Sequence, residues 1–138
     1  PEENVVLDDR ILVKACNDRI SLSVMPLYQE ERDKMKLADA NEFVISAFGR
    51  CGNDDNVISD GPEYAPGITM TCITMNGKLY AETLEGSMII KAQNKAVLEF
   101  LDTEGNVISS VEKAAKNGQV VFDLPGNVAS VFYHLWMD

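Results

Sequence analysis

Short turn signals recur through the second half of the chain, and their spacing restricts the fold more than any other feature. They stand roughly 8–12 residues apart, which is typical of a β-sandwich or barrel. The signals are Asn76-Gly77, Glu85-Gly86, Asn94-Lys95, Thr103–Asn106, Ala115–Gly118 and Pro125–Asn127. An Asn-Gly pair between two strand-like runs predicts a hairpin, so we expect Ile68–Met75 to pair with Lys78–Glu85.

These runs predict an all-β fold. We expect an antiparallel β-sandwich of about 8–10 strands in two packed sheets, with a jelly-roll or immunoglobulin-like topology and one long loop. A closed β-barrel is the alternative architecture. The chain has 138 residues, of which 46% are hydrophobic. This length suits a single domain, 1–138, that stabilises its core without a metal ion or a disulfide.

The first half of the chain is less regular. Arg19–Tyr28 alternates apolar and polar residues until Pro26, which lacks a backbone donor and therefore predicts an edge strand or a strand end. Gln29–Ala40 is rich in helix formers, and we expect one or two helical turns there, with a charged loop as the alternative. Asn41–Gly49 returns to a strand pattern.

The last strand-like run, VASVFYHLWM, carries bulky residues on both of its faces. One face holds Ala129, Val131, Tyr133, Leu135 and Met137, and the other holds Val128, Ser130, Phe132, His134 and Trp136. We expect the first set to face the core, because it is the more continuously apolar. The second set has two interpretations. It is either a second face of a fully covered strand, or a patch in which Phe132 and Trp136 contact a partner.

The stretch Gly49–Met70 contains four acidic residues, Asp54, Asp55, Asp60 and Glu63. Its glycines and prolines predict a long surface loop rich in turns. Asp54, Asp55 and Asp60 are candidate calcium ligands, although their spacing does not fit the EF-hand pattern. Tyr64 is either an exposed aromatic contact or a ring that covers one end of the core.

The charge balance excludes some partners. The net charge is -10, with 22 acidic and 12 basic residues, so the chain repels the phosphates of nucleic acids and of anionic membranes. No run is long and apolar enough for membrane insertion. The first residues, PEENVVLDDR, lack the basic and apolar regions of a signal peptide. We expect an intracellular or virion protein, with a mature secreted fragment as the alternative.

Catalytic signatures are weak. His134 is the only histidine, no G-x-S-x-G elbow is present, and a half-buried structural role is expected for it. Asp/Glu pairs of a hydrolase are a third, less favoured option. The three cysteines, Cys16, Cys51 and Cys72, show no paired-ligand spacing for zinc, so we expect buried free thiols.

Two functions follow as hypotheses. The first is a non-enzymatic structural or interaction protein, such as a virion or appendage component. It would assemble as a homo-oligomer or with a protein partner through the aromatic face of the last strand, including Phe132 and Trp136. The alternative is a glycan-binding module that uses the 49–70 loop, with calcium assistance. Its aromatic contact would be Tyr64 or Tyr80, together with the acidic residues Asp54, Asp55, Asp60 and Glu63.

Overall fold

The computed structural model describes residues 3–27, 39–53, 56–66, 68–75 and 79–138, and for 3–8, 53, 56–64, 68–75 and 79 it describes the backbone only. These residues form antiparallel β-strands. The strands are β1 (Glu3–Asp8), β2 (Ile11–Ala15), β3 (Ser21–Pro26), β4 (Glu42–Phe48), β5 (Cys51–Asn53), β6 (Asn56–Ala65), β7 (Ile68–Met75), β8 (Leu79–Ala81), β9 (Glu85–Lys91), β10 (Lys95–Leu101), β11 (Val107–Ala114), β12 (Gln119–Pro125) and β13 (Phe132–Met137). No helix in this part of the chain is both long and apolar enough to cross a membrane.

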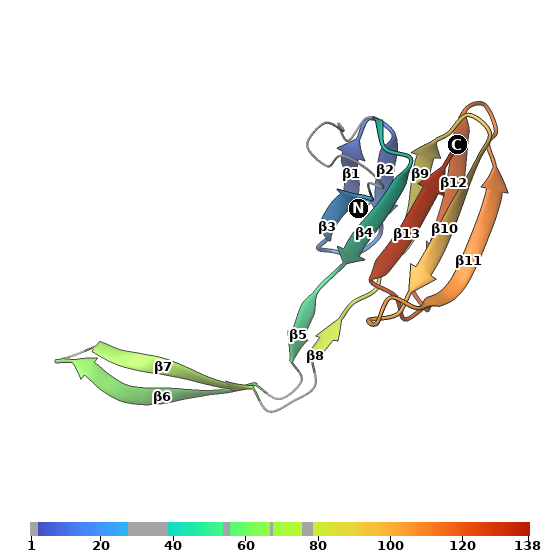
Figure 1. Ribbon diagram of the computed structural model, residues 1–138. Helices are drawn as coiled ribbons and strands as arrows, with labels where there is room; N and C mark the ends of the chain where they lie inside the picture. The colour runs from blue at the N-terminus through green and yellow to red at the C-terminus, as the bar shows by residue number, and fades with distance from the viewer. Residues whose placement is uncertain (1–2, 28–38, 54–55, 67, 76–78) are drawn as a thin grey trace. The chain divides into compact units, whose positions relative to one another are not determined.

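The strands divide into two compact units. The first unit comprises residues 1–50 and 82–138, and the second comprises residues 51–81. In the first unit, a four-stranded sheet has the order β1-β2-β9-β12 and a five-stranded sheet has the order β11-β10-β13-β4-β3 (Figure 1). Both sheets are open, so the predicted β-sandwich is confirmed and the closed barrel is not formed.

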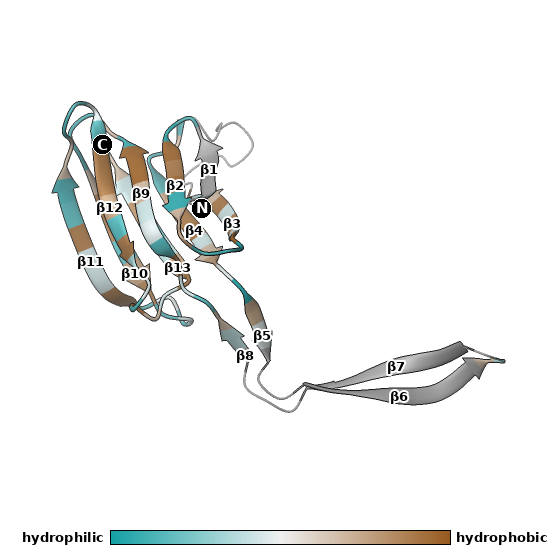
Figure 2. Cartoon of the chain, turned by 180° about the vertical axis from the view of Figure 1, so that it is seen from behind, coloured by the Kyte–Doolittle hydropathy of each residue, from teal (hydrophilic) through white to brown (hydrophobic). Residues whose placement is uncertain are grey.

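One hydrophobic core lies between the two large sheets. Strands from both sheets bury every second side chain, as in β2, β4, β10, β12 and β13. Figure 2 shows the resulting interleaving of hydrophobic and hydrophilic residues along these strands. The largest fully buried side chains include Tyr133, Phe43, Phe122, Ile45, Met88 and Leu135. Burial raises the pKa of Tyr133 to about 12, because the charged phenolate is poorly solvated there.

Several local predictions are confirmed. Asn117 and Gly118 have φ angles of 54° and 74°, the left-handed values that a tight hairpin turn between β11 and β12 requires. Pro26 ends β3, which is an edge strand. Tyr133, Leu135 and Met137 face the core, although β13 begins at Phe132 rather than at Val128.

The predicted turn at Glu85-Gly86 is wrong, because both residues belong to β9. Gly86 pairs with Ala15 of β2 and with Leu124 of β12. A Cβ at this position would collide with the Lys14 carbonyl oxygen. The glycine therefore serves a close approach of two backbones inside a sheet and not a turn.

The predicted long loop at 49–70 is also wrong. This stretch forms β5, β6 and the beginning of β7, in the second unit. Register shifts between Asp60, Glu63 and Ala65 accommodate Gly61 and Pro62 within β6, so residues that usually mark a loop are carried by bulges.

The hairpin predicted around Asn76-Gly77 has different partners. β7 pairs with β6, and β8 pairs with β5. Residues 76–78 lie outside the described residues, as does the predicted helical segment Gln29–Ala40 except for its last two residues.

Candidate interaction face of the five-stranded sheet

The strand β13 lies at the centre of the five-stranded sheet, between β10 and β4. Directly paired residues of these strands point to the same side of the sheet, so the register defines three rows of three outward residues. We call this surface the outer face; its residues are Val97, Trp136 and Glu42, then Glu99, His134 and Val44, then Leu101, Phe132 and Ser46. All nine are partly exposed, and the four-stranded sheet packs against the opposite side.

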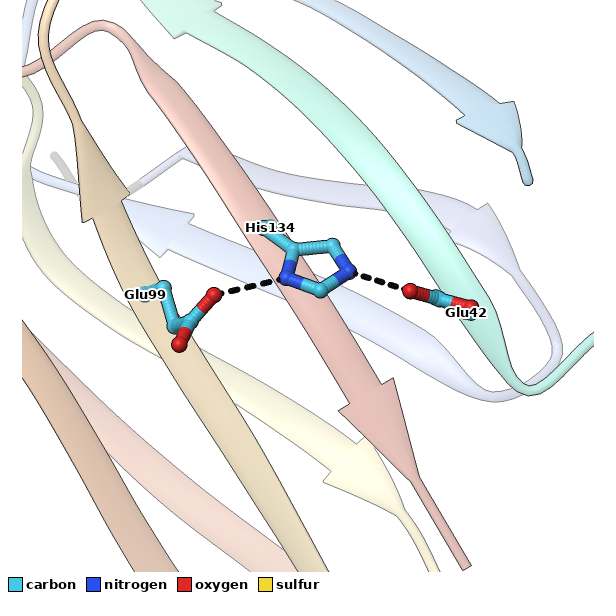
Figure 3. A network of polar contacts seen from close by, with 3 residues as sticks. All are labelled: Glu42, Glu99 and His134. Carbon is cyan, nitrogen blue, oxygen red and sulfur yellow. Dashed lines mark hydrogen bonds and ion pairs between the residues drawn. The ribbon is translucent and has the colours of Figure 1, made fainter. Parts of the chain in front are cut away.

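His134 stands in the middle of the outer face and contacts two carboxylates (Figure 3). Its Nδ1 lies 2.8 Å from Glu99 Oε2, and its Nε2 lies 2.7 Å from Glu42 Oε1. Glu99 is the direct partner of His134 on β10, whereas Glu42 lies diagonally, opposite Trp136 on β4. An ionised carboxylate only accepts hydrogen bonds, so both contacts are satisfied when both ring nitrogens carry a proton.

The electrostatics favour this charged imidazolium. Partial burial of the ring lowers the pKa of His134, but hydrogen bonds and charge attraction from Glu99 and Glu42 outweigh that effect. The net result is a pKa above the ordinary value of 6.5. When His134 is protonated, the three side chains together carry a charge of about -1 instead of -2.

The geometry limits what this cluster does chemically. While both ring nitrogens donate to carboxylates, neither accepts a proton from a substrate, as a general base must. Within the described residues, no group of three or more His, Cys, Asp or Glu side chains is arranged to hold a metal ion. When His134 is protonated, the cluster is therefore a partly neutralised polar centre in a surface whose other residues, apart from Ser46, are apolar or aromatic.

The two aromatic residues predicted for partner contact, Phe132 and Trp136, flank His134 on the outer face. The Lys95 Nζ lies over the Trp136 ring, 5.6 Å from its centroid, and also pairs with Glu112 at 3.0 Å. This lysine covers one face of the ring. The role proposed for the two aromatics in binding a partner stays a prediction.

Three of the other predicted site residues lie in the second unit. Asp60, Glu63 and Tyr64 belong to β6, for which only the backbone is described. Asp54 and Asp55 lie outside the described residues. Asp60, Glu63 and Tyr64 thus belong to a different unit from Phe132 and Trp136, and the calcium site stays a prediction.

Glu42 and Glu99 were not among the predicted site residues. One sequence feature could have pointed to Glu99. The run AVLEFLD is mostly apolar, yet it carries Glu99 on one face and Asp102 on the other. The prediction of buried thiols is wrong for Cys16 and Cys51, which are free and exposed. Cys16 directly follows β2 and Cys51 begins β5, so neither lies in the interior of a core strand.

No protein-family model, no curated protein and no solved structure matches this chain.

Proposed function

We propose that this chain is a non-enzymatic assembly protein that forms a homodimer through the outer face. One observation supports this most directly. The central strand β13 carries large side chains on both sides, and only Tyr133, Leu135 and Met137 have a covering sheet. Phe132 and Trp136 remain partly exposed on the other side. Strands with bulky residues on both faces are typical of sheets that are covered twice.

The charge distribution supports a second copy as the occupant. The whole chain carries a net charge of -10, which opposes self-association. On the outer face, however, a protonated His134 offsets one of two carboxylates, and Lys95 pairs with Glu112. A two-fold axis also allows Lys95 of one copy to approach an acidic side chain of the other. Local charge is therefore low where close approach is needed.

The area available for contact sets the expected affinity of the dimer. The outer face covers only the central three strands, but with β11 and β3 on its two sides the sheet has five strands, which are about 4.8 Å apart and about 24 Å long and together present roughly 550 Å². Two copies would then bury roughly 1,100 Å², which is at the lower end of specific interfaces. We therefore expect a reversible dimer with a dissociation constant in the micromolar range.

The glycan-binding alternative has less support. The 49–70 region on which it relied forms strands rather than a loop. On the outer face, Lys95 covers one side of Trp136, where a sugar ring would stack, and His134 already occupies an oxygen of both Glu42 and Glu99. The alternative stays a prediction, which a glycan array with and without chelator tests.

Analytical ultracentrifugation over a concentration series tests the dimer. We expect Trp136→Glu to weaken dimerisation at least about tenfold, because it places an unpaired charge in the interface. Phe132→Lys is a second variant with the opposite charge. Tyr80→Glu is the matched control, since Tyr80 is 50% exposed and lies in the other unit. A monomer at every concentration, or an unchanged dimer in both outer-face variants, would contradict the proposal.

A further inference from the structure

The hairpin of β6 and β7 has two unpaired edges. Within the described residues, these strands form a sheet of two and pair with each other only (Figure 1). A two-stranded sheet is marginally stable by itself, and its free N–H and C=O groups are available to another strand. The hairpin is therefore a candidate for strand addition.

Of the two strands, β7 has the less protected edge. Its sequence, ITMTCITM, contains no charged residue, no proline and no glycine, and is rich in β-branched residues. β6 carries Pro62, two acidic residues and two register shifts, all of which discourage edge pairing. We therefore take β7 as the strand that is added.

The two large sheets offer four edge strands, and three of them are protected or unfavourable. β1 has a register shift and carries Glu3 and Asp8, which repel an acidic hairpin. β3 is shorter and ends at Pro26. On β12, the Val121 carbonyl accepts a hydrogen bond from Lys113 Nζ at 2.8 Å.

The fourth edge, β11, fits the added strand better. It has eight residues, as β7 has, and contains neither proline nor glycine, although it also has one register shift, opposite Phe100 and Leu101, and carries Glu112 and Lys113. Val107 and Ile108 at its beginning are 53% and 50% exposed, so apolar area remains to be covered. A strand addition here satisfies backbone groups and buries these two side chains.

Charge also favours this pairing. Residues 51–77 contain Asp54, Asp55, Asp60 and Glu63 and no lysine or arginine. A groove of about 450 Å³ lies beside β11, toward β12, and both charged side chains that line it are lysines, Lys113 and Lys116. Lys113 also lies 3.8 Å from Asp123, so Lys116 contributes the less compensated charge. If β7 pairs with β11, then β6 lies about 10 Å from β11, which is within reach of screened electrostatic attraction.

We propose that β7 of one copy adds to the β11 edge of a second copy, with the acidic β6 alongside Lys113 and Lys116. The two surfaces differ, so the contact is heterologous and builds chains or rings larger than a dimer. The outer face instead makes a two-fold contact that closes at two copies. The inference is therefore independent of the proposed function, and the two have different stoichiometries.

The full-length chain tests this by ultracentrifugation between about 20 and 200 µM protein, at low and high salt. At low salt we expect assemblies larger than a dimer. At high salt these assemblies should contain fewer copies, because salt screens the attraction between the charged groups. Lys113→Glu with Lys116→Glu should weaken their formation about tenfold. The control, Lys14→Glu with Lys91→Glu, makes the same charge change outside the groove. We call the variant with Lys113→Glu and Lys116→Glu the groove variant. Adding Asp60→Lys and Glu63→Lys to it makes the two surfaces opposite in charge again and should restore assembly.

Hydrogen exchange and a second variant make the test independent of charge reversal. Raising the protein concentration should slow exchange in 68–75 and in 107–114 together, and Ile73→Lys should abolish both effects, because it replaces an apolar residue of the added strand with a charged one. The absence of any species larger than a dimer would overturn the proposal. An equal effect of the groove variant and its control, or protection in only one of the two segments, would also overturn it.

Discussion

The contacts of His134 predict a specific dependence of stability on pH. We consider the replacement His134→Gln, which removes the titrating ring and keeps a polar side chain of similar length. The side chains of His134, Glu42 and Glu99 are 25%, 30% and 28% exposed, so their pairs are better shielded than ordinary surface pairs. Exposed ion pairs contribute about 0.2–1 kcal/mol and hydrogen bonds to charged groups about 1.5–3 kcal/mol. We take about 1 kcal/mol for each contact, or about 2 kcal/mol in total.

The direction of the effect follows from the raised pKa of His134. The native state binds this proton more tightly than the unfolded chain does. The stabilisation is therefore fully present below the unfolded pKa, near 6.5, and is lost as the pH rises through the higher pKa of the native state. The free energy of unfolding of the natural sequence should fall by about 1–2 kcal/mol over this interval, whereas that of His134→Gln should show no such fall.

Urea unfolding from pH 5.5 to 9.5, followed by fluorescence, measures the difference. Trp136 is the only tryptophan and neighbours His134 on the outer face, so it reports directly on this region. Dilute protein keeps association out of the measurement. Glu99→Gln should remove part of the dependence, and Glu104→Gln, on an exposed turn, should not. A difference between the natural sequence and His134→Gln that is constant with pH, or that grows as the pH rises, would refute the reasoning.

Two further predictions concern the sandwich. Leu135 is 0% exposed, so Leu135→Ala should lower the free energy of unfolding by about 2–5 kcal/mol, whereas Val121→Ala, at a position that is 45% exposed, should change it by less than about 1 kcal/mol; equal losses in urea unfolding would contradict the observed core. Gly86 has a φ of 149° and no space for a Cβ beside the Lys14 carbonyl, so Gly86→Ala should cost about 3 kcal/mol or more. At Gly118, with a φ of 74° and nothing within 4 Å of an added Cβ, the same change should cost about 1 kcal/mol, and thermal melts of the two variants should rank accordingly.

Part of the candidate site was predictable from the sequence, because strand alternation is a local property. It assigned Tyr133, Leu135 and Met137 to the core and left Phe132, His134 and Trp136 on the other side. The partners of His134 were not predictable in this way. Glu99 lies 35 residues and Glu42 lies 92 residues from it in the chain, and only the pairing of β13 with β10 and β4 brings them together.

The 49–70 stretch is a second case, in which the local preference of the residues and the observed strand pairing disagree. Glycine and proline predicted a loop, because each disfavours a regular strand by itself. Pairing with β7 overrides that local preference, since bulges accommodate Gly61 and Pro62 while the rest of β6 keeps its backbone partners.

Short-range patterns in the sequence were enough to predict the all-β class, the turn that contains Asn117 and Gly118, the strand end or edge at Pro26 and the inward face of β13. Each depends on the φ angle, hydrogen-bonding capacity or alternation of neighbouring residues. The pairing of distant strands appears only in the folded chain, and it produces the His134 cluster, the composition of the outer face and the unpaired edges of β7 and β11. Strand pairing is set by long-range competition for backbone hydrogen bonds and buried apolar area, which no short segment of the sequence specifies.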